Sequence, residues 1–214
     1  MGIIRNGVNG GFSGKAGSVI GSSWNKVSYI KGLPKLSTKP ASLKQLDQRV
    51  RFGTVLAFMG PMKDILIMGY KGQTAGRATG FNMGIQHALI NAVVGTYPDY
   101  EIDYSLIQIS KGTLQQPSAV VLNSFVTEDL DVAWSPQVNT LNAFADDVLV
   151  ALIYNPTQKF FLSYTDVGLR ADGTATLTLP SDFSGQTVHA YFFYVMRDGT
   201  RQSISAYAAP IEIV

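Results

Sequence analysis

The C-terminal half of the chain alternates between short apolar runs and turn-forming residues, and this pattern constrains the fold more than any other feature. Candidate strands cover residues 102–109, 118–123, 129–134, 147–154, 159–164, 174–179, 187–196 and 202–207, with the last able to continue to residue 214. Turn-forming pairs such as Asn155-Pro156 and Asp172-Gly173 separate them. Seven or eight short strands in about 110 residues predict an antiparallel β-sandwich.

Residues 37–100 carry the spacing of helices instead. Ser42 and Gln45 form a capping box, and the apolar residues that follow recur at helical intervals until a Gly-Pro pair, which is expected to end or kink the helix. A second short helix is expected over residues 61–70. A third is expected over residues 81–95, where the chain reaches a glycine shortly before a proline.

Residues 1–36 are rich in glycine and lysine, and they contain a candidate hairpin. The stretch VIGSSWNKVSYIKG predicts two short strands around a two-residue turn at Asn25-Lys26. The register that this turn imposes is a set of facing pairs: Trp24 with Val27, Ser22 with Tyr29, and Ile20 with Lys31. One side of the hairpin then gathers Ile20, Trp24, Val27 and Tyr29. Because an isolated hairpin is marginal in water, this side needs another surface to cover it.

Together these patterns predict an α+β fold with three regions. Residues 1–36 form an extended N-terminal arm with a β-hairpin, residues 37–100 form a short helical region, and residues 101–214 form an immunoglobulin- or fibronectin-like antiparallel β-sandwich. Trp134 is typical of the core tryptophan of such a sandwich, and Tyr191 is the candidate for its tyrosine corner.

The opening FSGKAGSVIGSSWNKVSYIKGLPK, followed by KPASLKQLDQRVRF, resembles the N-terminal signature of an uncharacterised protein family. That family is widespread in Bacteroidota and in sequences linked to their phages. The similarity runs the whole length of the chain, with a looser match in the β-rich part. It implies a short protein with a glycine-rich arm, a helical middle and an immunoglobulin-like end. The resemblance implies no reaction, so function has to be argued from physical chemistry.

The composition narrows the classes of function. Cysteine is absent, which removes disulfides, thiolate nucleophiles and zinc–sulfur sites. Only 15% of the residues are charged, below the usual quarter, so much of the surface is neutral and suits packing against copies of the same chain. No apolar stretch has the length of a membrane span or the pattern of a secretion signal. We expect no membrane span and leave the localisation open between the cytoplasm and a virion or extracellular particle.

The charge is divided unevenly along the chain. Residues 1–80 hold twelve lysines and arginines against two acids, whereas residues 81–214 hold five against thirteen. The basic part can neutralise the phosphates of a nucleic acid, or it can meet the acidic part of a neighbouring copy. The lysines that we expect to make such contacts are Lys15, Lys26, Lys31, Lys35 and Lys39.

No motif in the sequence predicts a catalytic, cofactor or metal site. The stretch GGFSGKA lacks the first glycine and the hydroxyl of a phosphate-binding loop. His87 and His189 lie far apart in sequence, and structural roles are expected for both. The paired carboxylates offer too few oxygen ligands for calcium: Asp129 with Asp131, and Asp146 with Asp147. We therefore expect a protein that is not an enzyme and has no small-molecule substrate.

Aromatic residues favour one alternative function, because tyrosine and tryptophan can stack on sugar rings. The aromatic residues of the predicted strands are Phe160, Phe161, Tyr164, Tyr191, Phe192, Phe193 and Tyr194. Strand alternation buries about half of such a set. Exposed members of the run at 191–194 could line a binding face for a glycan or a protein.

The function that these features favour is that of a non-enzymatic structural subunit that self-assembles, as a protein of a phage virion, a phage-like particle or another filament. The arm would add strands to an open sheet edge of a neighbour, with Ile20, Trp24, Val27, Tyr29 and Ile30 in the interface. Its partners would be copies of itself or other structural proteins of the particle. Two alternatives stay open: a surface-binding module for glycan or protein, and a DNA-associated protein that uses the basic N-terminal part. The arm could also dock on its own chain.

Overall fold

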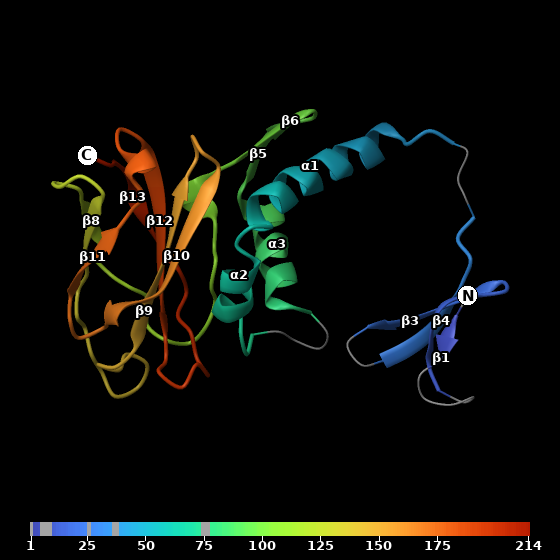
Figure 1. Cartoon of the computed structure of the whole chain (residues 1–214), viewed down its shortest axis with the longest axis horizontal. Coiled ribbons are helices and arrows are strands. Elements are labelled where there is room, and N and C mark those ends of the chain that lie inside the picture. Colours follow the sequence, from blue (N-terminus) through green and yellow to red (C-terminus); the bar gives the residue numbers. More distant parts are fainter. Residues whose placement is uncertain (1, 5–9, 25–26, 36–38, 74–77) are drawn as a thin grey trace. The chain divides into compact units, whose positions relative to one another are not determined.

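The computed structural model describes residues 2–4, 10–24, 27–35, 39–73 and 78–214 (Figure 1). The chain divides into two compact units, which we call the N-terminal unit (Met1–Leu43) and the body (Lys44–Val214). The three regions expected from the sequence are therefore not three compact units, because the helices and the C-terminal strands belong to the same body.

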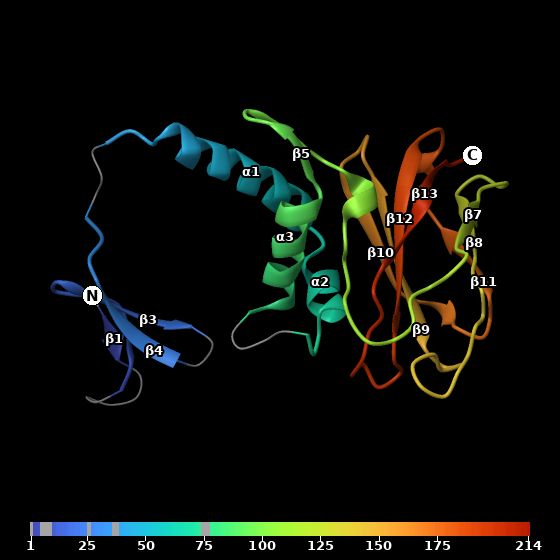
Figure 2. The ribbon, with the colours of Figure 1, turned by 180° about the vertical axis from the view of Figure 1, so that it is seen from behind.

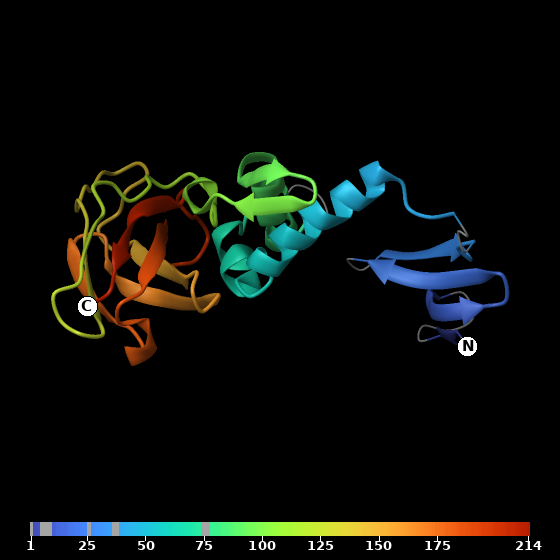
Figure 3. The same cartoon turned by 90° about the horizontal axis from the view of Figure 1, so that it is seen from above.

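The N-terminal unit is a small antiparallel sheet, drawn in blue in Figure 3. Its strands follow the order of the chain: β1 (Ile3–Ile4), β2 (Phe12–Ala16), β3 (Val19–Trp24) and β4 (Val27–Gly32). The predicted hairpin is confirmed as β3 and β4, and all three predicted facing pairs occur in its register. The turn at residues 25–26 lies outside the described residues.

Three helices open the body: α1 (Leu43–Met59), α2 (Lys63–Gly69) and α3 (Gly80–Asn91). As predicted, the Gly-Pro pair ends α1, and the axes of α1 and α2 differ by 85°. Within the described residues, no single helix is long and apolar enough to cross a membrane, and only α1 and α2 taken together across this bend match a span in length and composition.

The prediction that the third helix reaches residue 95 is wrong. The helix ends at Asn91, and the next residues form a hairpin of β5 (Val93–Thr96) and β6 (Asp99–Ile102). Two consecutive β-branched valines and a glycine with a φ of 93° favour the strand over the helix here. Gly84, which weakens α3 on its own, has a packing role, because a Cβ atom there would lie 2.7 Å from the Cδ2 atom of Leu66 in α2.

The remaining strands form two antiparallel sheets. The first has the order β11-β8-β7, and the second has the order β10-β9-β12-β13. Their bounds are β7 (Val121–Asn123), β8 (Asp129–Ala133), β9 (Val148–Asn155), β10 (Phe160–Leu169), β11 (Thr174–Thr178), β12 (Thr187–Val195) and β13 (Ala206–Glu212). Two stacked antiparallel sheets are the arrangement of immunoglobulin- and fibronectin-like sandwiches, so the predicted α+β fold class is confirmed.

Two short 3-10 helices complete the fold: η1 (Tyr104–Leu106) and η2 (Ser181–Phe183). The strand predicted at residues 102–109 is wrong, because the carboxylate of Asp103 accepts a hydrogen bond from the amide of Ser105 and starts η1. Ile107 and Ile109 then lie buried against the helices without belonging to a strand.

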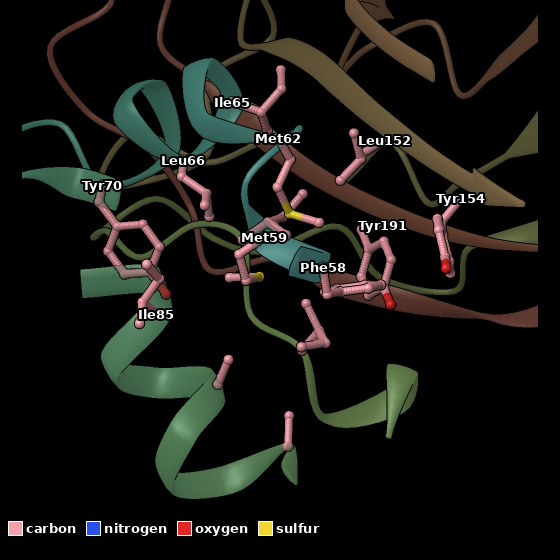
Figure 4. Packing of buried hydrophobic residues seen from close by; sticks show 14 of the residues in the cluster. Phe58, Met59, Met62, Ile65, Leu66, Tyr70, Ile85, Leu152, Tyr154 and Tyr191 are labelled. Atoms are coloured by element: carbon pink, nitrogen blue, oxygen red, sulfur yellow. The ribbon is translucent and has the colours of Figure 1, made fainter. Parts of the chain in front are cut away.

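The central strands β9 and β12 are buried on both faces. One face packs against the three-stranded sheet, and the other packs against the helices, as Figure 2 shows. Figure 4 shows the helix-side cluster, in which Leu152, Tyr154 and Tyr191 of the sheet contact residues of α1 and α2. Burial on both faces explains why these strands read as continuous apolar runs in the sequence.

Of the two residues predicted to mark an immunoglobulin-like sandwich, Trp134 has the expected position and Tyr191 does not. Trp134 lies in the core between the sheets, and its Nε1 atom donates a hydrogen bond of 3.1 Å to the carbonyl oxygen of Arg170. The tyrosine-corner prediction is wrong. The hydroxyl of Tyr191 donates a 2.8 Å hydrogen bond to the carbonyl oxygen of Tyr104, far upstream in η1, because its side chain points to the helix side of the sheet.

Candidate assembly surface

Within the N-terminal unit, no described residue covers one face of the sheet, and we call it the hairpin face. The register of β3 with β4 places the side chains of Ile20, Trp24, Val27 and Tyr29 on this face, as predicted. Trp24 is 37% exposed and Tyr29 is 44% exposed. The face therefore presents apolar and aromatic groups to its surroundings.

The opposite face of this sheet is partly covered by the start of β2. A Cβ atom at Gly21 would collide with the carbonyl oxygen of Phe12 and would lie 2.6 Å from its ring. A Cβ atom at Gly11 would likewise collide with the side chain of Ser28. Two of the glycines in the basic arm are thus required by close approach of backbone and side chains, not by a phosphate or a catalytic turn.

The N-terminal unit has no hydrophobic core among the residues whose burial the structure describes. Gly21 is the only residue of this set that is buried, and every described apolar side chain is at least partly exposed. Chains of about 40 residues rarely bury enough apolar surface to be stable without disulfides, metals or a partner. This unit contains no cysteine, so disulfides do not stabilise it.

The predicted contact residues separate into three groups. Lys15 and Lys31 both face Ile20 in the sheet register, so two lysines flank the apolar part of the hairpin face. Ile30 faces Gly21, so the structure places it on the other side of the sheet from Trp24, and the five proposed interface residues do not share one face. Lys35 and Lys39 follow β4 and are exposed, while Lys26 lies outside the described residues.

The histidines of the body have structural surroundings. The Nδ1 atom of His189 lies 2.7 Å from the hydroxyl of Tyr207, and burial lowers the pKa of its imidazole. Burial and the nearby charge of Lys111 lower the pKa of His87. Among the residues that the structure places, no group of three His, Asp or Glu side chains is arranged to hold a metal ion.

One of the paired carboxylates belongs to a network that sequence reasoning missed. Asp147 is fully buried and lies 3.0 Å from the Nη2 atom of Arg170, which is 1% exposed. The guanidinium also donates to the carbonyl of Gln115 and lies 3.7 Å from the centre of the Tyr194 ring. No sequence spacing links these residues, and Arg170 lies in the turn after β10, where an arginine gives no sign of burial.

The aromatic run at 191–194 is not a binding face. All four of its side chains are fully buried, so that part of the alternative hypothesis is wrong. A pocket of about 510 Å³ does exist between α1 and the sheet, lined by Phe58, Tyr104, Tyr154, Phe161 and Lys159 among others. It brings together aromatic residues that lie far apart in the sequence.

Comparisons with known proteins show the family of the chain. The chain matches the solution structure of the fn3 domain of the human collagen alpha-1(XX) chain, at 18% identity and a TM-score of 0.35, over 47% of this chain and 86% of that one. It also matches the fn3 domain of human contactin 1, at 9% identity and a TM-score of 0.27, over 49% and 77%. No curated protein matches. A family model described as "Family of unknown function (DUF6266)" matches residues 11–209, so the chain belongs to that family.

Proposed function

We propose that the chain is a non-enzymatic structural subunit that self-assembles through its N-terminal unit. The observation that carries the proposal is a folded sheet that exposes aromatic side chains and buries no described hydrophobic residue of its own. Exposed aromatic groups rimmed by polar residues are typical of protein interfaces. The hairpin face would gain its missing burial from the body of a neighbouring copy.

The distribution of charge supports a copy of the same chain as the partner. Lys15 and Lys31 make the hairpin face positive, whereas residues 81–214 hold thirteen acids, of which only Asp147 is buried. Complementary potentials orient such a contact and speed its formation. Because two different surfaces meet, repetition of the contact closes into a ring or continues as a filament. We place the assembly in a phage virion or phage-like particle on the strength of the N-terminal resemblance.

The experiment is light scattering of the purified protein over a range of protein and salt concentrations, followed by negative-stain microscopy. The unchanged chain should associate at low salt, and the contact of the hairpin face with the acidic body should weaken as salt screens the charges. The Trp24→Ser and Tyr29→Ser variants should lose the contact between the hairpin face and the body of a neighbouring copy. Leu141→Ser is the matched control, because Leu141 is 81% exposed in the body and its loss should change nothing.

Three outcomes would count against the proposal. A chain that stays monomeric under all conditions, and is unchanged by deletion of residues 1–36, would show that the N-terminal unit needs no second copy. Equal loss of association in Leu141→Ser would indicate non-specific apolar contact. Salt-sensitive binding of single-stranded DNA by a monomeric chain would favour the DNA-associated alternative, with Trp24 and Tyr29 stacking on bases.

The pocket beneath α1 favours a second candidate, a surface-binding module. Its volume of about 510 Å³ is in the range of ligand sites, and its lining includes four aromatic residues together with Glu101 and Lys159. A glycan array tests this function directly. Binding that is abolished by Phe161→Ala and unaffected by Trp24→Ser would support it, and an array without a specific ligand would contradict it.

A further inference from the structure

Among the described residues, no strand pairs with the outer edge of β4. The amide of Leu33 donates a 3.2 Å hydrogen bond to the carbonyl of Ser18, which makes these two residues a hydrogen-bonded pair of the ladder. Hydrogen-bonded and non-hydrogen-bonded pairs alternate in an antiparallel ladder. The amide and carbonyl groups of Ser28, Ile30 and Gly32 therefore point away from β3, toward the open edge.

This edge lacks prolines and bulges, and Lys31 is the one charged residue of β4. Natural edge strands carry prolines, bulges or charges that prevent the addition of another strand. β4 contains no proline, keeps an unbroken register with β3 and is exposed along all six residues. Its central outward residue, Ile30, is 64% exposed.

We propose that β4 pairs with β4 of a second copy, antiparallel, with a two-fold axis at Ile30. The proposal rests on the proposed self-assembly and specifies one of its contacts. Two sheets of four strands would join into one continuous sheet. The hairpin face remains free in this arrangement, because edge pairing uses backbone groups and covers neither face of the sheet.

The sequence of β4 is self-complementary about Ile30. With Ile30 opposite its own copy, Ser28 lies opposite Gly32, and these three outward-facing pairs form roughly six hydrogen bonds, two for each pair. The same register sets Tyr29 opposite Lys31 of the second copy on one face, where an ammonium can lie over the ring. An axis at Lys31 would oppose two like charges, and an axis at Ser28 would pair fewer residues.

The charge of the N-terminal unit determines how salt changes the strength of the β4–β4 contact. Residues 1–43 hold six lysines and arginines and no acid, so two such units repel each other at low ionic strength. Salt at physiological concentration screens charges beyond about 8 Å and should strengthen the pairing of β4 with β4. The contact of the hairpin face with an acidic body should weaken over the same range.

Cysteine cross-linking tests the register, because the natural chain has no cysteine. Opposite residues of a hydrogen-bonded pair have Cα atoms about 5.5 Å apart, within the range of about 4.4–6.8 Å that a disulfide spans. Ile30→Cys should therefore form a disulfide dimer under mild oxidation. Ser28→Cys is the matched control, because the two substituted residues would be offset by four positions, roughly 13 Å along the strand.

We expect Ile30→Cys to cross-link at least ten times faster than Ser28→Cys. A mixture of Ser28→Cys and Gly32→Cys should form a disulfide between the two variants, and the open space around Gly32 accommodates the new side chain. Equal rates for Ile30→Cys and Ser28→Cys would overturn the proposal. So would the absence of cross-links in a protein that scattering shows to self-associate, whereas a monomeric chain without cross-links would defeat the proposed function as well.

A charge swap supplies an independent readout. Ile30→Lys and Ile30→Glu should each lose edge pairing, since two like charges would face each other at the axis. Mixing the two variants should restore a dimer that contains one of each, measured by native mass spectrometry. A dimer formed by either variant alone, or the absence of a mixed dimer after mixing, would contradict a two-fold axis at Ile30.

Discussion

Replacement of Asp147 should destabilise the body more than replacement of an exposed charge. The carboxylate lies 3.0 Å from Arg170 in surroundings that leave both side chains at most 1% exposed. It also accepts a hydrogen bond of 2.9 Å from the amide of Phe144. Asp147→Asn keeps the shape of the side chain but leaves the guanidinium charge buried without a counter-ion.

Removal of one partner of a buried ion pair costs about 3–5 kcal/mol. A domain of this size loses roughly 2–4 °C of Tm for each kcal/mol, so the midpoint should fall by roughly 6–20 °C. Asp146→Asn is the matched control, because Asp146 is the exposed neighbour and should change stability by less than about 0.5 kcal/mol. The double variant Asp147→Leu with Arg170→Met should recover at least half of the loss, because an apolar pair of similar volume avoids the desolvation of two charges.

Urea unfolding followed by tryptophan fluorescence is the assay. Trp134 reports on this network directly, since its indole donates to the carbonyl of Arg170. The chain has two tryptophans, so a Trp24→Phe background leaves Trp134 as the single probe. Unfolding of Asp147→Asn at the same urea concentration as Asp146→Asn would refute a stabilising role for the buried pair. The same holds if the double variant loses as much stability as Asp147→Leu alone and Arg170→Met alone lose in sum.

Three further predictions follow from the packing and the titration of the chain. Gly21→Ala should unfold the N-terminal sheet, because its methyl group collides with Phe12, while Gly32→Ala should be tolerated; limited proteolysis compares the two. Gly112→Ala should lower the thermal midpoint, since a Cβ atom there collides with the carbonyl of Gln202, and a midpoint equal to that of the unchanged chain would contradict this. Burial lowers the pKa of His189 below its unfolded value of about 6.5, so the native state binds fewer protons than the unfolded state. The free energy of unfolding should therefore fall as the pH drops from 7.5 to 5. The urea midpoint should fall less over this range in His189→Gln than in the unchanged chain.

The elements that the sequence predicted well are those with strong local signals. The register of the hairpin follows from the two-residue turn, and the sandwich strands follow from regular turn spacing. The end of α1 follows from a Gly-Pro pair. Each of these signals acts within a few residues, so no knowledge of distant packing was needed.

Local residues explain where α3 ends and where η1 starts, and distant contacts account for the other differences from the sequence predictions. The strand predicted at residues 102–109 has apolar alternation, yet Ile107 and Ile109 are buried against helices and not within a sheet. The position of Tyr191 in its strand predicts a tyrosine corner, but it does not reveal that helices cover the face of the sheet on which Tyr191 lies. The partnership of Asp147 with Arg170 and the lining of the aromatic pocket likewise depend on tertiary folding.

The two-sided burial of β9 and β12 determines how the body comes apart. The helices cannot detach without exposing five side chains of these strands to water: Val150, Leu152, Tyr154, Tyr191 and Phe193. Each large apolar side chain returned to water costs about 1.5–3 kcal/mol, which together rivals the whole stability of a typical domain. Helices and sandwich should therefore unfold as one cooperative block. The sandwich expressed without residues 43–91 should therefore expose this apolar face and aggregate.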